Sequence, residues 1–160
     1  MVKAVTMLKE FHNTTQDSNL VKNNQVICHR DLAPWNSVVF NGEPVAFIDF
    51  DGVEPGERVE DLAYLLWTFL DLGDENINLD KQLERITLLC KTYGYSDGIR
   101  LVENIIKEQE KVLLHRKNLS ENSSNLELKE FSKNRIVLIE RQIKWVKKNK
   151  KAIEISVIQD

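Results

Sequence analysis

The sequence has few cysteines, glycines and prolines, and it has no long apolar run. Its two cysteines, Cys28 and Cys90, are too few for a disulfide framework and match no metal-binding or redox spacing. No stretch reaches the ~20 apolar residues that a membrane-spanning helix needs, and the N-terminus has no apolar signal core. The net charge of −3 is too small to indicate a nucleic-acid partner. These absences favour a cytoplasmic protein with neither a membrane nor a nucleic-acid partner.

The residues that are present predict one folded domain in which helices predominate. Hydrophobic residues make up 42% and charged residues 29% of the chain, which is typical of a globular protein. Helical spacing of apolar residues predicts helices over 3–13, 59–70, 79–93 (ended by Gly94), 96–118 (capped by Ser96) and a last one after a linker at 121–125. Short apolar runs predict strands at 25–28, 37–40 and 44–48, with a loop at 52–58. The fold class is therefore α+β, mostly α, with a small β-hairpin.

The hairpin has an unusual distribution of apolar side chains. Asn41-Gly42 between two β-prone runs predicts a two-residue turn, which places Val38 opposite Val45 and Val39 opposite Pro44. Both faces of the hairpin are then apolar, whereas the helices of this domain can cover only one of them. An uncovered apolar face on a soluble protein usually marks an interface. We therefore expect a homodimer through the hairpin surface.

Polar side chains gather where this hairpin begins and ends. The octet His29–Asn36 lies between two apolar strands, and the hairpin returns the chain to it at Ile48–Asp51. Asp31, Asn36 and Asp49 are thereby expected to lie close together. Carboxylate and amide oxygens are the ligands that magnesium prefers. A carboxylate beside such a metal could take the proton of a substrate hydroxyl while a phosphoryl group is transferred.

These residues also resemble a known family. Asp31 and Asn36 have the D-x-x-x-x-N spacing of a kinase catalytic loop, with His29 two residues before the aspartate, and Asp49 follows on the strand after a tight hairpin. Ile48-Asp49-Phe50-Asp51 and the absence of an Ala-Pro-Glu segment resemble the aminoglycoside phosphotransferase branch, and the context is closest to its trifolitoxin-immunity-like members. The resemblance covers roughly residues 4–70 with motifs. It implies the C-terminal lobe of a protein-kinase-like phosphotransferase.

The resemblance assigns a role to each residue of the site. It implies that Asp31 is the catalytic base and that Asn36 and Asp49 are magnesium ligands. It also implies that Asp51 is an outer ligand of the magnesium. His29 is expected to bond the backbone of its own loop, and Asp61 resembles the aspartate that anchors the catalytic loop from below. The family reaction is transfer of the γ-phosphoryl group of ATP or GTP to a small-molecule hydroxyl, with a role in antibiotic resistance or immunity.

The sequence departs from the family at its N-terminal side. No glycine-rich strand pair precedes residue 25, and no lysine stands where the family binds nucleotide phosphates. We therefore expect 1–160 to be a phosphotransferase C-terminal lobe without its N-terminal nucleotide lobe, with a catalytic loop at 29–36, a metal-binding strand end at 48–51 and a helical subdomain at 59–150. It should bind magnesium weakly, and bind ATP or GTP only if an N-terminal lobe is supplied.

Three alternatives stay open at this point. A catalytically silent remnant or binding module would retain the loop without the reaction. The strand that leads into Asp49-Phe50-Asp51-Gly52 resembles a haloacid-dehalogenase nucleophile motif, although Val53 replaces its threonine and the strand belongs to an antiparallel hairpin. The nine acids between Asp49 and Glu75 could attract a cationic aminosugar. Trp35 is expected to pack under the loop, and His12 and His115 to lie on helix surfaces.

Overall fold

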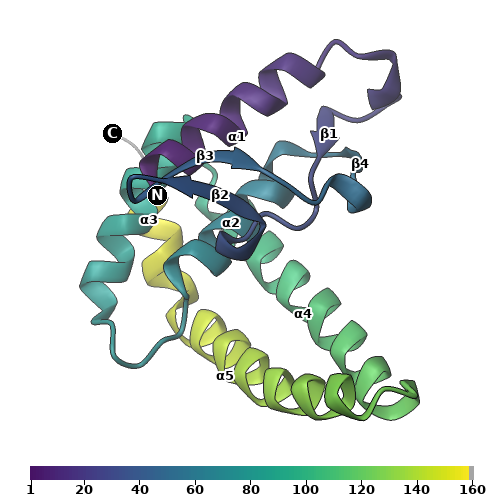
Figure 1. Cartoon of the computed structure of the whole chain (residues 1–160). Helices are drawn as coiled ribbons and strands as arrows, with labels where there is room; N and C mark the ends of the chain where they lie inside the picture. The colour runs from purple at the N-terminus through teal and green to yellow at the C-terminus, as the bar shows by residue number, and fades with distance from the viewer. Residues whose placement is uncertain (159–160) are drawn as a thin grey trace.

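The computed structural model of the chain describes residues 1–158, in which helices predominate and four short strands form two separate sheets (Figure 1). This confirms a fold that is mostly α with a small β part. The α-helices are α1 (Val2–Thr15), α2 (Arg58–Leu70), α3 (Leu79–Tyr93), α4 (Gly98–Asn122) and α5 (Leu126–Val157). The strands are β1 (Val26–Cys28), β2 (Ser37–Phe40), β3 (Glu43–Phe47) and β4 (Glu54–Gly56), and short 3-10 helices are η1 (Asn19–Val21), η2 (Pro34–Asn36) and η3 (Phe50–Gly52).

Strand β4 corrects the prediction of a loop over 52–58. It pairs antiparallel with β1, so that Val26 lies opposite Gly56 and Cys28 opposite Glu54. A Glu-Pro-Gly segment has little intrinsic preference for a strand. Its extended conformation is instead fixed by a partner that lies far away in sequence. The pairing brings the chain after the hairpin back against the strand that precedes the octet.

The predicted hairpin is confirmed, but its register is shifted by a bulge. Asn41 and Gly42 have positive φ values of 50° and 77°, as the two-residue turn requires. Val39 pairs with Pro44 as predicted, whereas Val38 pairs with Ala46 and not with Val45. Val45 is the extra residue of a bulge. Pro44 has no N–H for the ladder, so an irregularity beside it interrupts the pairing at little further cost.

The boundaries of α4 differ from the prediction at both ends. Asp97, and not Ser96, caps the helix by accepting a hydrogen bond from the N–H of Arg100 at 3.0 Å, and the helix continues to Asn122. α4 and α5 then form a long antiparallel pair whose connected end projects from the rest of the molecule (Figure 1). At the other end Gly98 packs so closely that a Cβ there would lie 2.9 Å from Glu154 Cα. The close contact brings the start of α4 against the last turns of α5, so the two helices are also packed together at the end opposite their connection.

Helix α2 lies at the centre of the core and carries residues that shape the site. Nine of its 13 residues are buried and the other four are half-buried, as its apolar sequence predicts. Trp67 donates a hydrogen bond to Gln142 of α5 at 2.9 Å, which ties the projecting pair to the core. Leu32 and Ala33 of the octet are fully buried, so the octet rests on the core.

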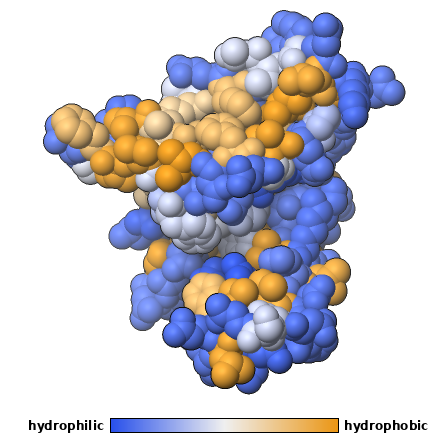
Figure 2. Space-filling view, turned by 45° about the vertical axis from the view of Figure 1, so that its right-hand side comes forward, coloured by the Kyte–Doolittle hydropathy of each residue, from blue (hydrophilic) through white to orange (hydrophobic). Residues whose placement is uncertain are grey.

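The hairpin leaves a large apolar surface uncovered. Helix α1 packs against β3, while Val38, Val39 and Phe40 of β2 are all exposed, Phe40 at 66%. Figure 2 shows a continuous hydrophobic area across the upper part of this face of the molecule. No helix within residues 1–158 is both long and apolar enough to cross a membrane.

Candidate active site

The octet is held in place by a buried carboxylate beneath it. Asp61 of α2, which is 1% exposed, accepts hydrogen bonds from the backbone N–H of His29 at 2.7 Å and of Arg30 at 2.9 Å. Arg30 has a φ of 73°, a left-handed conformation that is unfavourable for a residue with a side chain. The two bonds to Asp61 stabilise that turn. The contacts are those expected of an aspartate that anchors a catalytic loop.

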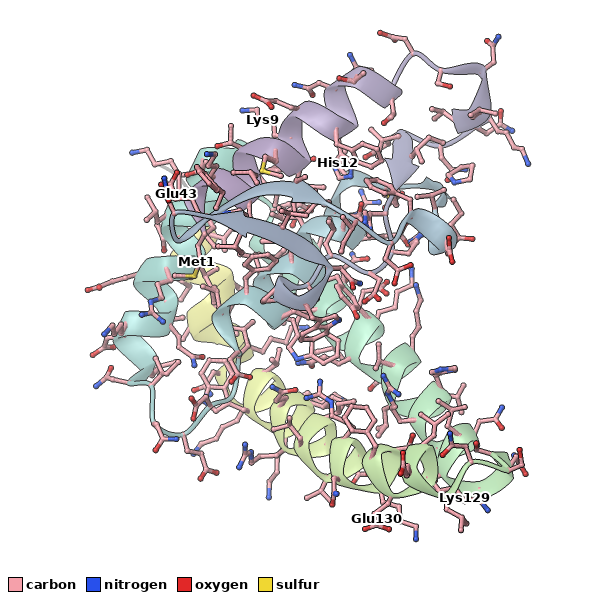
Figure 3. The ribbon with its side chains drawn as sticks, in the orientation of Figure 1. Met1, Lys9, His12, Glu43, Lys129 and Glu130 are labelled. Carbon is pink, nitrogen blue, oxygen red and sulfur yellow. The ribbon has the colours of Figure 1, made fainter. Side chains whose placement is uncertain are left out.

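The same carboxylate contacts His12, so the prediction that this histidine lies on a helix surface is wrong. His12 is fully buried and lies on the side of α1 that faces the rest of the molecule (Figure 3). Its Nε2 is 3.1 Å from Asp61 Oδ2, and its Nδ1 is 2.6 Å from the hydroxyl of Tyr93. Burial raises the pKa of Tyr93 to about 12, so the hydroxyl stays protonated. α1 and α3 thus support the octet through this chain of contacts. His115, by contrast, is exposed as predicted.

Asp31 is held by two polar groups from different elements. The hydroxyl of Tyr64 donates to its Oδ1 at 2.6 Å, and the side-chain amide of Asn36 donates to its Oδ2 at 2.7 Å. Burial, reinforced by the bond to Asp31, raises the pKa of Tyr64, so this tyrosine remains a donor. Tyr64 was not singled out from the sequence, because in an apolar helix it reads as an ordinary core residue. The two donors fix the orientation of a half-buried carboxylate.

Asn36 joins the octet to the end of the hairpin. Its amide nitrogen also donates to the backbone oxygen of Asp31 at 3.0 Å, which leaves Oδ1 as an oxygen donor for another group. The backbone oxygen of Asn36 accepts from the N–H of Ile48 at 3.0 Å. The imidazole of His29 bridges the octet and the end of the hairpin. Its Nδ1 accepts a hydrogen bond from the N–H of Asp31 at 3.3 Å, and its Nε2 is 3.1 Å from the backbone oxygen of Ile48. The contact of His29 with its own loop is therefore present. Asp49, the next residue after Ile48, follows directly on this junction.

The donors near this junction fit magnesium in type. Asn36 offers an amide oxygen, and Asp49, whose backbone has a φ of 65°, offers an exposed carboxylate. These two hard oxygen donors therefore come from two backbone segments that lie next to each other. Asp51 is also exposed, in η3. Within residues 1–158, the acids Asp31, Asp49 and Asp51 do not form a close group of three. The one group whose ligand atoms lie within 4.8 Å of one another is His12, Cys28 and Asp61.

That buried group has a structural role. The carboxylate of Asp61 is occupied by the octet backbone and His12, and the thiol of Cys28 donates to Glu57 O at 3.3 Å. Burial raises the pKa of Cys28 and that of Cys90, the latter to about 12, so both thiols stay protonated and unreactive. A protonated, hydrogen-bonded thiol is a poor metal ligand.

Arg30 is part of a network of ion pairs beside the octet. Its guanidinium lies 2.9 Å from both Glu54 Oε1 and Glu60 Oε2, and donates to Pro55 O at 3.1 Å. Burial alone would raise the pKa of Glu60, but the N–H of Glu57, Lys107 and Arg30 together lower it. Glu60 is thus ionised and fixes Arg30. This arginine joins β4 to the octet, and each of its three side-chain nitrogens already faces an oxygen of the protein.

Two cavities open beside Asp31. One of about 480 Å³ is lined by Asp31 and Tyr64 together with residues of α4, and another of about 270 Å³ extends from the same pair toward α5. Trp35 lines the second cavity and is 58% exposed, so the prediction that it packs under the loop is wrong. Its position after Pro34 turns the ring outward, away from the core that Leu32 occupies. Asp31 therefore faces space in which a small molecule fits.

Most of the acids between Asp49 and Glu75 do not line these cavities. Glu57 pairs with Arg100, Glu60 pairs with Arg30 and Lys107, and Asp61 lies beneath the octet. Only Glu54 of this acidic stretch lines either cavity beside Asp31. An attraction of cationic aminosugars by this stretch consequently has little support in the geometry.

Comparison with a known protein family covers the part of the chain that contains this site. The sequence model of the family described as "Phosphotransferase enzyme family" matches residues 7–86, half of the chain. The trifolitoxin immunity protein of Rhizobium leguminosarum bv. trifolii is 32% identical over 85 residues, which are 49% of this chain and 33% of that protein. The chain thus spans about a third of the length of this curated relative. No solved structure matches it significantly. The resemblance inferred from the octet is confirmed at the level of the family.

Proposed function

We propose that this chain, which belongs to the phosphotransferase enzyme family, forms the C-terminal lobe of a kinase-like enzyme that transfers the γ-phosphoryl group of ATP or GTP to a small-molecule hydroxyl. The observation that carries the proposal is the setting of Asp31. Its carboxylate is oriented by Tyr64 and Asn36 and borders two cavities. A base in such a position accepts a proton from a bound hydroxyl.

In this proposal the residues of the site have separate roles in the transfer reaction. Asp31 orients the acceptor hydroxyl and takes its proton as the oxygen attacks phosphorus. Asn36 and Asp49, with Asp51 as an outer ligand, hold magnesium, which when bound neutralises charge on the transferring phosphoryl group. Asp61 holds the octet in place from below, and His29 fixes the position of the octet relative to the end of the hairpin. Because phosphoryl transfer depends mainly on positioning, these support residues matter as much as the base.

A role in immunity or resistance is part of the proposal. The name of the trifolitoxin immunity protein, to which this chain is similar, suggests such a role. Phosphorylation of a toxic small molecule would add negative charge and change how it is recognised. A chain that binds without transferring is the competing possibility, and the measurements below separate the two.

Magnesium is expected to control nucleotide binding. With Mg-ATP near its Kd, at millimolar concentration, the stabilisation is about 0.4 kcal/mol, or roughly 1–2 °C in melting temperature. ATP together with a chelator that removes magnesium should leave the melting temperature unchanged, because the phosphates and the carboxylate of Asp49 then repel each other. Thermal unfolding of the 160-residue chain with and without magnesium measures this.

The matched control is Asp17→Asn, which removes an equal charge at an exposed position outside the site. It should retain the shift, whereas Asp49→Asn should lose it. An equal shift in the presence and absence of magnesium would contradict the proposal, and so would a shift that Asp49→Asn leaves unchanged.

The hairpin surface is proposed to bind a second copy of this chain. Val38, Val39, Phe40 and Val45 are all more than 40% exposed, so a twofold contact would bury an apolar patch in each copy. A stable contact needs about 1,000 Å² of buried area or more. Light scattering at tens of micromolar should report about twice the monomer mass. Phe40→Asp should give the monomer, whereas Leu126→Asp, at another exposed apolar position, should not. A monomeric wild-type chain would overturn this proposal.

A further inference from the structure

The two cavities beside Asp31 are parts of one groove. They share Asp31, Tyr64, Val112 and Arg116, so they meet at the proposed base. A third cavity of about 200 Å³ continues from the second, with which it shares Trp35 and Arg135. The groove therefore runs between the octet with α2 on one side and the α4–α5 pair on the other. In Figure 3 side chains from both sides project into this space.

Aromatic side chains form much of the wall on the α5 side of Asp31. Trp35, Tyr64, Trp67 and Phe131 all line the second cavity. The rings of Tyr64 and Trp67 pack edge to face, with centroids 5.5 Å apart, so this part of the wall is rigid. Trp35 and Phe131 are more than half exposed, which leaves ring surface for a ligand. Such walls favour a planar, apolar group.

Two arginines on the same wall have no acidic partner. Arg116 and Arg135 form no salt bridge within residues 1–158, whereas Arg30 and Arg100 are paired with glutamates. The guanidinium of Arg116 lies over the ring of Phe131, 5.2 Å from its centroid. Its Nε is shielded from solvent and has no hydrogen-bond partner within residues 1–158. Because Arg116 lines both cavities beside Asp31 and has no carboxylate partner there, its guanidinium group can pair with an anionic ligand.

We infer that the acceptor is a hydroxylated aromatic carboxylate, whose ring stacks between the aromatic side chains and whose acidic group pairs with Arg116 and Arg135. The inference rests on the proposed function, because it names the substrate class of the same site. Among residues 1–158, Asp31 is the single acid that lines the second cavity, and the two arginines Arg116 and Arg135 line the same cavity. The cavity consequently favours an anion and disfavours a polycationic aminosugar.

Three phenols of similar shape test the inference. They are 3-(4-hydroxyphenyl)propionate, tyramine and tyrosol, which carry a negative, a positive and no charge at neutral pH. We expect ligand-observed NMR titration of the full chain to give the carboxylate a Kd at least about tenfold lower than that of tyramine, with tyrosol between them.

Substitutions locate the binding. Arg135→Gln is expected to raise the Kd of the carboxylate about tenfold and to leave that of tyrosol within about twofold. Arg141→Gln, which removes an exposed arginine from the same helix outside the groove, should change neither. Arg116→Gln should act as Arg135→Gln does, and its melting curve shows whether the packing on Phe131 survives.

Each outcome has a defined meaning. Equal binding of the three phenols, tighter binding of tyramine, or no measurable binding of any of them overturns the inference. If the carboxylate fails to bind but Mg-ATP still stabilises the chain in a way that needs Asp49, the phosphotransferase proposal stands and the acceptor class is wrong. If the carboxylate binds through Arg135 but neither Mg-ATP nor manganese binds in a way that needs Asp49, the groove stands as a binding site and the phosphotransferase proposal fails.

Discussion

Replacing Asp61 with alanine is expected to lower the free energy of unfolding by about 3–5 kcal/mol. The carboxylate is 1% exposed and accepts from His29 N–H and Arg30 N–H, while His12 lies 3.1 Å away. Alanine leaves these groups buried without a partner, and nothing in the core replaces the lost oxygens. The positive φ of Arg30 also loses its support. For a chain of this length the melting temperature should fall by roughly 6–20 °C.

Thermal and urea unfolding measure this loss. Asp61→Asn keeps one acceptor oxygen, so we expect an intermediate loss and a chain that still folds. Asp17→Ala removes an exposed acid whose carboxylate has no hydrogen-bond or ion-pair partner within residues 1–158, and it should stay within about 0.5 kcal/mol of the wild type. If Asp61→Ala were as stable as Asp17→Ala, the carboxylate would not be the support of the octet.

Local patterns were sufficient to predict much of the site. The Asn41-Gly42 turn returns the chain to the octet, and the turn depends only on two residues that accept positive φ. The helix over Leu79–Tyr93, ended by Gly94 at a φ of 84°, was likewise predicted with its limits. In these cases the conformation is determined by neighbouring residues, so the sequence carries the signal directly.

The features that were missed depend on partners far away in sequence. His12 belongs to the polar end of α1, and only the packing of α1 against α2 and α3 makes it buried. Strand β4 exists because β1 pairs with it, and its own residues do not favour a strand. Tyr64 reads as a core residue until the fold places its hydroxyl 2.6 Å from Asp31. A single sequence has no local pattern for such long-range contacts.

The proposed metal site can be tested separately from the fold. Asn36 and Asp49 offer the oxygen donors at the junction of the octet and the hairpin, and Asp49 is exposed, so its loss should leave the core intact. We expect manganese, as a substitute for magnesium, to bind in the millimolar range. Asp49→Asn should weaken that binding roughly tenfold or more, because a neutral amide is a poorer ligand than a carboxylate.

Manganese titration followed by water-proton relaxation is the most direct test of a metal-dependent phosphotransferase site in this chain. Saturable relaxation enhancement is expected with the wild type and with Asp17→Asn, and no saturable enhancement with Asp49→Asn over the same range. Equal enhancement by Asp49→Asn and the wild type would contradict the assignment of Asp49 and, with it, the proposed site at the hairpin end.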